Sequence, residues 1–176
     1  AFVKKGDKLI SKELRSRKFN CKIIKVNPKI TNNFLKKINN DYFFSEPNRE
    51  NLLFVWEISK KLNLKKNSFL KTVEDFKGLK YRQQIVFKNK YLTVVNDSKS
   101  TSFSSSIGIL KTYSNIHWLL GGIHKKADIF NLPKNYFRNI KAYVYGKDRK
   151  FFNKKLDRKI KYENFDSLKD ATNKVF

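Results

Sequence analysis

The pattern of apolar and polar residues divides the chain into two regions of different character. In the first region, residues 1–77, short apolar runs bounded by turns predict strands, at residues 2–4, 8–10 and 21–26. Apolar residues at helical spacing then predict two helices, at residues 52–62 and 68–76. Residues 31–39 fit a short helix or a loop equally well. The first region therefore reads as a small α+β segment.

The second region begins at Gly78, which follows the second predicted helix and marks a hinge at residues 77–80. A strand pair opens it, with strands at residues 81–87 and 91–96 and a turn at 88–90. Strands and helices then alternate: helix 103–113, strand 116–120, loop 121–128, helical turn 133–138, strand 140–145, helix 149–156, strand 159–162 and helix 167–175. This order implies right-handed crossovers. It predicts an α/β fold, a Rossmann-like, mostly parallel sheet with helices on both faces.

The junction between the strand 91–96 and the next helix combines several polar groups. Asp97, Lys99 and Thr101 follow the strand directly, and the hydroxyls of Ser100, Thr101 and Ser102 are available to cap the helix. Ligands bind at this edge of an open α/β sheet. The amino end of a helix favours anions, and Lys99 adds a mobile cation. Asp97 alone would read as an ordinary capping residue.

The formal charge of +25 suggests nucleic acid or an anionic membrane surface as a partner, but its distribution argues against both. Lysine and arginine are spread over most of the chain. Between residues 91 and 124, in contrast, the only formally charged residues are Asp97, Lys99 and Lys111. A nucleic-acid groove would concentrate charge at the functional region. We therefore expect a solvated basic surface and no nucleic-acid partner.

The cysteine and methionine content limits which covalent links, metal sites and cellular locations are expected. Cys21 is the single cysteine, so the chain forms no internal disulfide, and we expect a structural thiol. We predict no metal site, because His124 has no His or Cys nearby in the sequence. No segment is apolar enough to span a bilayer, so we expect no membrane partner and a cytoplasmic location. We also expect a monomer. The absence of methionine and the abrupt first residues suggest a fragment of a longer polypeptide.

Four segments carry a resemblance to a known family. They are Pro47-Asn48-Arg49-Glu50-Asn51, Leu79-Lys80-Tyr81-Arg82, Asn96-Asp97-Ser98-Lys99-Ser100-Thr101, and Leu119-Leu120-Gly121-Gly122 followed by Lys125 and Ala127-Asp128. In order and spacing they resemble the Mur ligases, whose patterns read H-N-x-x-N, L-P-H-R, N-D-S-K-A-T-N and L-G-G-x-x-K-x-x-D. The N-D-S-K-x-T element is the specific one. The resemblance is strongest to the branch of the family that adds D-glutamate.

The resemblance implies a domain division and an activity. Residues 1–77 would be the carboxy-terminal part of the central ATP-binding domain, and residues 78–176 a carboxy-terminal domain truncated at its end. Such ligases use ATP and Mg²⁺ to activate a carboxylate as an acyl phosphate, which an amino acid then attacks. UDP-N-acetylmuramoyl-L-alanine and D-glutamate would be the substrates, in peptidoglycan synthesis. No G-x-x-G-K-[ST] phosphate loop occurs in the sequence, so we expect this chain alone to be inactive.

The resemblance also implies roles for individual residues. Asn48 and Asn51 would hold the adenine, while Arg82 and Asp97 would meet the ribose, the phosphates or the water around them. Thr101, Lys125 and Lys99 would bind D-glutamate, and Lys99 with Asp97 would act in catalysis.

Departures from the family pattern leave other readings open. Pro47 replaces His, Lys80-Tyr81 replace Pro-His, and Ile123-His124 stand where Asp-Gly is usual. Ile123 puts the amino-acid contacts in question. Another ligase of the superfamily, for a different muramoyl peptide or for folate polyglutamates, is the first alternative. A basic nucleic-acid-binding module is the second.

Overall fold

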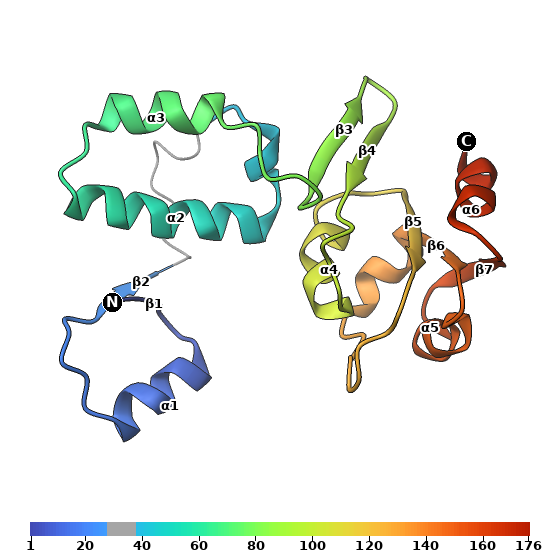
Figure 1. Cartoon of the computed structure of the whole chain (residues 1–176), viewed down its shortest axis with the longest axis horizontal. Helices are drawn as coiled ribbons and strands as arrows, with labels where there is room; N and C mark the ends of the chain where they lie inside the picture. Colours follow the sequence, from blue (N-terminus) through green and yellow to red (C-terminus); the bar gives the residue numbers. More distant parts are fainter. Residues whose placement is uncertain (28–37) are drawn as a thin grey trace. The chain divides into compact units, whose positions relative to one another are not determined.

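The computed structural model describes residues 1–27 and 38–176, and these form two compact units, Ala1–Lys77 and Gly78–Phe176 (Figure 1). Residues 31–37, most of the segment predicted as helix or loop, lie outside the described residues. Ile38 and Asn39 belong to no helix or strand. The identification of these units with the central and carboxy-terminal domains of the family stays a prediction.

The first unit opens with two short parallel strands joined by a helix. β1 (Phe2–Lys4) pairs with β2 (Ile24–Val26), and α1 (Lys8–Ser16) lies between them in the sequence. The predicted strand at residues 8–10 is therefore wrong. The carboxylate of Asp7 accepts a hydrogen bond from the Ile10 N–H at 3.0 Å and starts a helix there. Cys21 is exposed and precedes β2, so it is not a structural thiol of that strand.

Two helices pack together in the rest of this unit. The 3₁₀ helix η2 (Asp41–Phe44) leads into α2 (Glu46–Lys61), and α3 (Lys66–Asp75) follows. Their apolar faces meet in a small core of Leu52, Trp56, Phe69 and Val73. Both helices begin before the predicted positions. The N-cap of α2 is Ser45, and Asn48 lies within the first turn, where Pro47 also fits.

The second unit begins with an antiparallel hairpin. β3 (Gln84–Lys88) pairs with β4 (Thr93–Asn96), and the register shifts by one residue between Ile85 and Phe87. The predicted strand pair is thus confirmed. In the described residues, β4 pairs with β3 and is not hydrogen-bonded to the parallel sheet that follows. The predicted parallel sheet is therefore formed only by strands that follow α4 (Phe103–Leu110) among the described residues.

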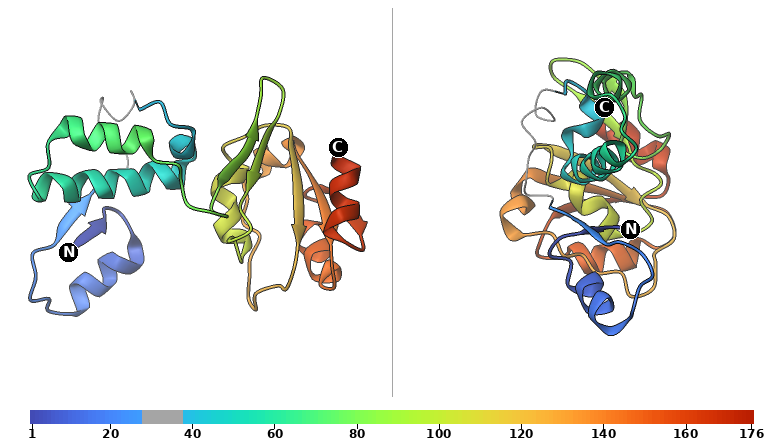
Figure 2. Two further views of the ribbon diagram at one scale, coloured as in Figure 1. Left: turned by 45° about the horizontal axis from the view of Figure 1, so that its top comes forward. Right: turned by 90° about the vertical axis from the view of Figure 1, so that its left-hand side faces the viewer.

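A three-stranded parallel sheet in the order β5-β6-β7 forms the centre of this unit (Figure 2). Its strands are β5 (Ile116–Gly121), β6 (Ile140–Tyr145) and β7 (Lys161–Phe165). The connections contain η3 (Lys134–Asn139) and α5 (Arg149–Leu156), and α6 (Leu168–Val175) ends the chain. The predicted α/β fold is confirmed. Strand β7 begins two residues after the prediction, and α4 ends at Leu110 instead of 113.

The two faces of β6 carry different side chains because side chains alternate along a strand. Ala142 and Val144 are fully buried against Phe103 of α4 and Leu156 of α5. Tyr143 points to the opposite face, where its ring stacks with Phe165 at 6.0 Å. Helix α6 lies on the side of the sheet away from α4 (Figure 2). Helices thus cover both faces of the sheet, as predicted.

Among the described residues, no helix combines the length and apolar character that crossing a membrane requires.

Candidate functional site

Asp97 connects two loops at the carboxyl end of β4. Its Oδ1 accepts a hydrogen bond from the Gln83 N–H at 3.0 Å, and its Oδ2 accepts one from the Ser100 hydroxyl at 2.6 Å. The Ser100 N–H also donates to the Asp97 carbonyl at 2.8 Å. Asp97 does not cap α4, which is the role that its sequence position alone would have suggested. Its carboxylate instead fixes the polar loop after β4 against the segment before β3.

The segment before β3 brings Arg82 to the same place. Its turn is closed by the Arg82 N–H, which donates to the Leu79 carbonyl at 3.2 Å. Tyr81 and Gln83, on either side of Arg82, have positive φ angles of 64° and 48°. The Lys99 N–H donates to the Tyr81 carbonyl at 3.0 Å. Backbone contacts therefore bring the Arg82 turn and the Asp97–Lys99 loop together, and the side chains of both cations are exposed.

Two separate groups cap the amino end of α4. The hydroxyl of Ser102 accepts a hydrogen bond from the Ser105 N–H, and Ser105 returns a side-chain contact to the Ser102 N–H, which completes a capping box. The first helical N–H, that of Phe103, donates to Oδ2 of Asp128 at 2.7 Å. Asp128 is 9% exposed and comes from the loop after β5. Side chains from two parts of the chain thus satisfy this helix end.

The loop after β5 leaves the sheet at two glycines. A Cβ on Gly121 would lie 2.6 Å from both the carbonyl oxygen and the ring of Tyr145 on β6, so only glycine fits this close approach. Gly122 has a φ of +100°, which other residues adopt only with strain. Together they turn the chain sharply and lead it to Lys125. The pair therefore serves a tight turn at the end of β5.

His124, next to Lys125, is fixed to the start of α5. Its backbone N–H donates to Oδ2 of Asp148 at 2.9 Å, and its Nδ1 lies 2.8 Å from the same oxygen. The His124 ring also stacks on Phe151, with centroids 4.1 Å apart. The backbone hydrogen bond, followed by the side-chain one, lowers the pKa of Asp148 below its ordinary value. Asp148 therefore keeps its negative charge at this contact.

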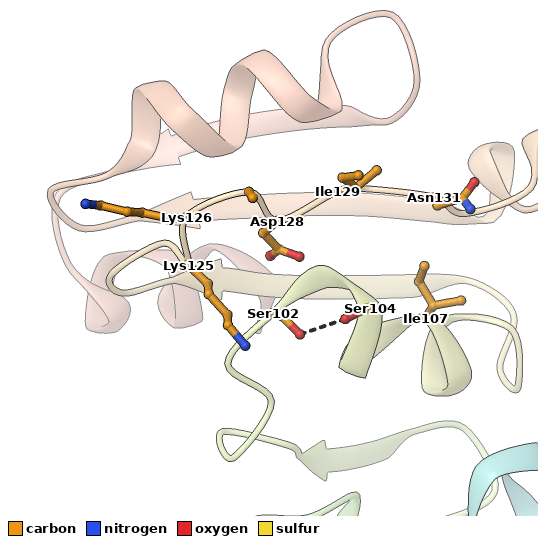
Figure 3. Close-up of a pocket in the computed structure, with 9 residues that line it drawn as sticks. Ser102, Ser104, Ile107, Lys125, Lys126, Asp128, Ile129 and Asn131 are labelled. Carbon is orange, nitrogen blue, oxygen red and sulfur yellow. Dashed lines mark hydrogen bonds between the residues drawn. The ribbon is translucent and has the colours of Figure 1, made fainter. Parts of the chain in front are cut away.

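A cleft of about 590 Å³ lies between the Lys125 loop and the amino end of α4 (Figure 3). Its lining residues are Ser102, Ser104, Ile107, Lys125, Lys126, Ala127, Asp128, Ile129 and Asn131. The Lys125 side chain points toward Ser102 at the start of the helix (Figure 3). A cation and hydroxyls form a surface suited to a carboxylate or a phosphate.

The structure unites some of the predicted site residues and separates others. Arg82, Asp97, Lys99 and Thr101 lie on connected loops, whereas Lys125 lines the cleft at the amino end of α4. Neither Lys99 nor Thr101 is among the residues that line the cleft. Asp128, whose carboxylate joins the two loops of the cleft, was not among the predicted site residues. Its position in the K-x-x-D element was the signal that could have identified it.

The two predicted adenine-binding residues belong to the first unit. Asn48 is buried in the first turn of α2, and its amide donates to the Tyr42 carbonyl at 2.7 Å. Asn51, three residues later, is exposed on the same helix. The amide of Asn48 therefore has a structural role in holding η2 against α2. Within the described residues, no group of three or more His, Cys, Asp or Glu side chains is arranged to hold a metal ion.

No protein-family model matches the chain. Curated proteins do: the UDP-N-acetylmuramoylalanine–D-glutamate ligase of Wolbachia pipientis wMel is 32% identical over 129 residues, which cover 73% of this chain and 25% of that ligase. The ligase of the same name from Francisella tularensis subsp. tularensis strain FSC 198 is 33% identical over 132 residues, covering 73% of this chain and 32% of that protein. The chain thus spans about a quarter to a third of the length of these relatives.

Solved structures give a fold-level comparison. UDP-N-acetylmuramate-alanine ligase MurC from Thermotoga maritima matches with a TM-score of 0.53 over 74% of this chain and 31% of that chain, at 16% identity. At this identity the likeness concerns the fold.

Proposed function

The chain belongs to the Mur ligase family, and on this premise we propose that it is part of a ligase that adds D-glutamate to UDP-N-acetylmuramoyl-L-alanine with ATP. The reaction would activate the substrate carboxylate as an acyl phosphate, and the amine of D-glutamate would then displace phosphate. The observation that carries this proposal is the alignment of 73% of the chain with ligases of that name. The proposed activity belongs to a longer polypeptide that contains this chain.

The cleft beside α4 supports a role in binding the incoming amino acid. We propose that Lys125 pairs with a carboxylate of D-glutamate, because its side chain lines the cleft and points toward the hydroxyl of Ser102. Thr101, directly before the N-cap of α4, would contribute its hydroxyl. Lys99 would approach from the loop after β4 as a mobile cation. Cations of this kind stabilise the negative charge that develops during acyl transfer.

The nucleotide contacts are proposed for Arg82, Asp97, Asn48 and Asn51. Arg82 and Asn51 are exposed, so a ligand can reach their side chains. Both carboxylate oxygens of Asp97, in contrast, accept hydrogen bonds within the protein. The sequence has no phosphate loop, and the described residues form no metal cluster. The residues of this chain therefore do not by themselves fit ATP with Mg²⁺, and we assign no reaction step to them through the nucleotide.

A different amino acid is the second candidate substrate, and Ile123 favours it. This side chain is 93% exposed in the loop that carries Lys125, at a position where the family pattern has Asp. A ligase with another amino-acid specificity would keep the same cleft and use different loop contacts. A nucleic-acid-binding module is less favoured, because the basic residues are spread over the chain instead of gathered at the cleft.

An assay of phosphate release tests these proposals. The longer protein would be incubated with ATP and UDP-N-acetylmuramoyl-L-alanine while the amino acid is varied. We expect release that depends on D-glutamate and that falls by about tenfold or more in Lys99→Ala, Lys125→Ala and Arg82→Ala. Lys147→Ala, an exposed lysine in the turn after β6, is the matched control and should keep full activity. Release with another amino acid would overturn the substrate, and no release with any would overturn the ligase assignment.

A further inference from the structure

The segment that carries Lys125 is fastened to the rest of the unit on both sides of that residue. His124, one residue before it, bonds to Asp148, which precedes α5. Asp128, three residues after it, bonds to Phe103 at the start of α4. The Asp128 N–H also donates to the Lys125 carbonyl at 3.2 Å and closes the turn between them. Two carboxylates therefore determine where the Lys125 backbone lies.

The anchor at Asp148 combines polar and aromatic contacts. Oδ2 of Asp148 accepts a hydrogen bond from the backbone N–H of His124 and is also in hydrogen-bond contact with Nδ1 of the His124 ring. Phe151, one turn into α5, lies under the same ring. Asp148 and Phe151 therefore hold both the main chain and the side chain of His124. Because Gly-Gly opens the loop, such an anchor is needed to give it one conformation.

The anchor at Asp128 is nearly buried and has a strong partner. A carboxylate that accepts the first N–H of a helix gains both a charge-assisted hydrogen bond and the favourable end of the helix dipole. The length of 2.7 Å fits that kind of bond. The same helix end forms the opposite wall of the cleft, through Ser102 and Ser104. Asp128 thus fixes the distance between the Lys125 loop and the wall that its ammonium faces.

We propose that Asp128 and Asp148 are positioning residues that hold Lys125 in place for the carboxylate of the incoming amino acid. This inference rests on the proposed function. A lysine side chain loses much rotational freedom when it binds a ligand, and a mobile backbone would add to that cost. Because the backbone is anchored on both sides of Lys125, the entropic cost of ordering that backbone is not added when the ligand binds. The anchors act on amino-acid binding and leave nucleotide binding unchanged.

Steady-state kinetics of the longer protein test this role. We expect Asp128→Ala and Asp148→Ala to raise the KM for the amino acid by about five- to tenfold, with the KM for ATP changed by less than about twofold. Asp128→Asn keeps an oxygen that can accept the Phe103 N–H, and it should recover most of the loss. Asp157→Ala is the matched control, since Asp157 is 63% exposed and its ion-pair contact with Arg158 spans 3.8 Å. A variant that merely unfolds the unit would lower the amount of active enzyme and leave both KM values of the remaining enzyme unchanged.

A second measurement applies to the chain itself. Hydrogen exchange should show faster exchange of the Phe103 amide, and of the amide of residue 128 that donates to the Lys125 carbonyl, in Asp128→Ala than in Asp157→Ala, with core amides of β6 unchanged. An active enzyme whose amino-acid KM is unaffected by both alanine substitutions would overturn this inference and leave the proposed function intact. Absence of activity with every amino acid would overturn both, so the two failures are distinguishable.

Discussion

Asp97 shows how a residue of the specific family element is used in the folded chain. Its two oxygens accept hydrogen bonds from Gln83 and Ser100, which lie in different loops. A carboxylate that satisfies two donors in this way lowers the energy of one loop arrangement relative to others. In the proposed enzyme, Asp97 therefore orders the loops that carry Arg82 and Lys99.

Substitution of Asp97 tests this structural role. Asp97→Ala removes the carboxylate oxygens that accept from the Gln83 N–H and the Ser100 hydroxyl, and we expect the free energy of unfolding to fall by about 1–3 kcal/mol. Asp97→Asn retains one acceptor oxygen and should lose less. Urea denaturation followed by circular dichroism measures both. Asp157→Ala is the control, with an expected change of less than about 0.5 kcal/mol for its exposed, long ion-pair contact. Equal stability of Asp97→Ala and the parent chain would contradict the role.

Gly121 gives a second prediction at this scale. In Gly121→Ala the new methyl group would lie 2.6 Å from the Tyr145 carbonyl oxygen, so the strands β5 and β6 must move apart locally. Overpacking of this kind costs about 1–3 kcal/mol. Thermal unfolding of the chain should show the loss as a lower Tm, whereas Lys126→Ala, an exposed position in the same loop, should leave Tm nearly unchanged. An unchanged Tm in Gly121→Ala would mean that the close approach is absent in solution.

Single residues also show where sequence-based prediction reached its limit. Asp97, Lys99 and Gly122 could be assigned to loops at strand ends, because the change at the end of each apolar run is visible locally. The bond from Phe103 to Asp128 joins residues 25 positions apart, and no local pattern encodes that pairing. The burial of Asn48 and its bond to the Tyr42 carbonyl likewise become visible only in the folded unit.

At the scale of elements, buried strands were predicted well and helix ends less well. Strand β6 and helix α5 have the predicted bounds, since a continuous apolar run or a clear apolar stripe defines them. Helix α4 ends three residues early, because Gly108 and the weak helix formers Thr112 and Tyr113 lower the helix propensity of this end. The segment 8–10 became helical because the Asp7 cap and the polar residues after Ile10 outweigh a short apolar run. Helix capping therefore determines the secondary structure where the apolar pattern alone is ambiguous.

The contact between the Lys125 loop and α5 predicts a pH response. Hydrogen bonds from His124 lower the pKa of Asp148. A carboxyl with a lowered folded-state pKa contributes stability that is present above its unfolded pKa of about 3.9 and lost as the pH falls through the folded value. Carbon-detected NMR titration of the Asp148 carboxyl should therefore give a midpoint below about 3.9, and His124→Ala should move it upward. A midpoint at or above about 3.9 would contradict the contact.

At the scale of the whole chain, the net charge of +25 predicts weak attraction to any polyanion. This attraction should be non-specific, because the charge is spread over the chain and the central segment is nearly free of it. Fluorescence anisotropy with two unrelated RNA sequences should give equal affinities that fall by orders of magnitude, about 10³-fold or more, between roughly 50 and 200 mM salt. A preference above about tenfold for one sequence at the higher salt would favour the nucleic-acid alternative.

The division of the chain into two units gives the last prediction. The core around Phe103, Val144 and Leu156 is built from residues of the second unit alone, so a polypeptide of residues 78–176 contains all the buried apolar groups of that core. We expect it to unfold cooperatively in urea, and its NMR amide signals should overlay those of the same residues in the whole chain. Val144→Asp, at a fully buried position, is the control that should abolish folding, because it buries an unpaired charge. If residues 78–176 alone are unfolded, the second unit depends on residues before Gly78, and its assignment as a separate domain is wrong.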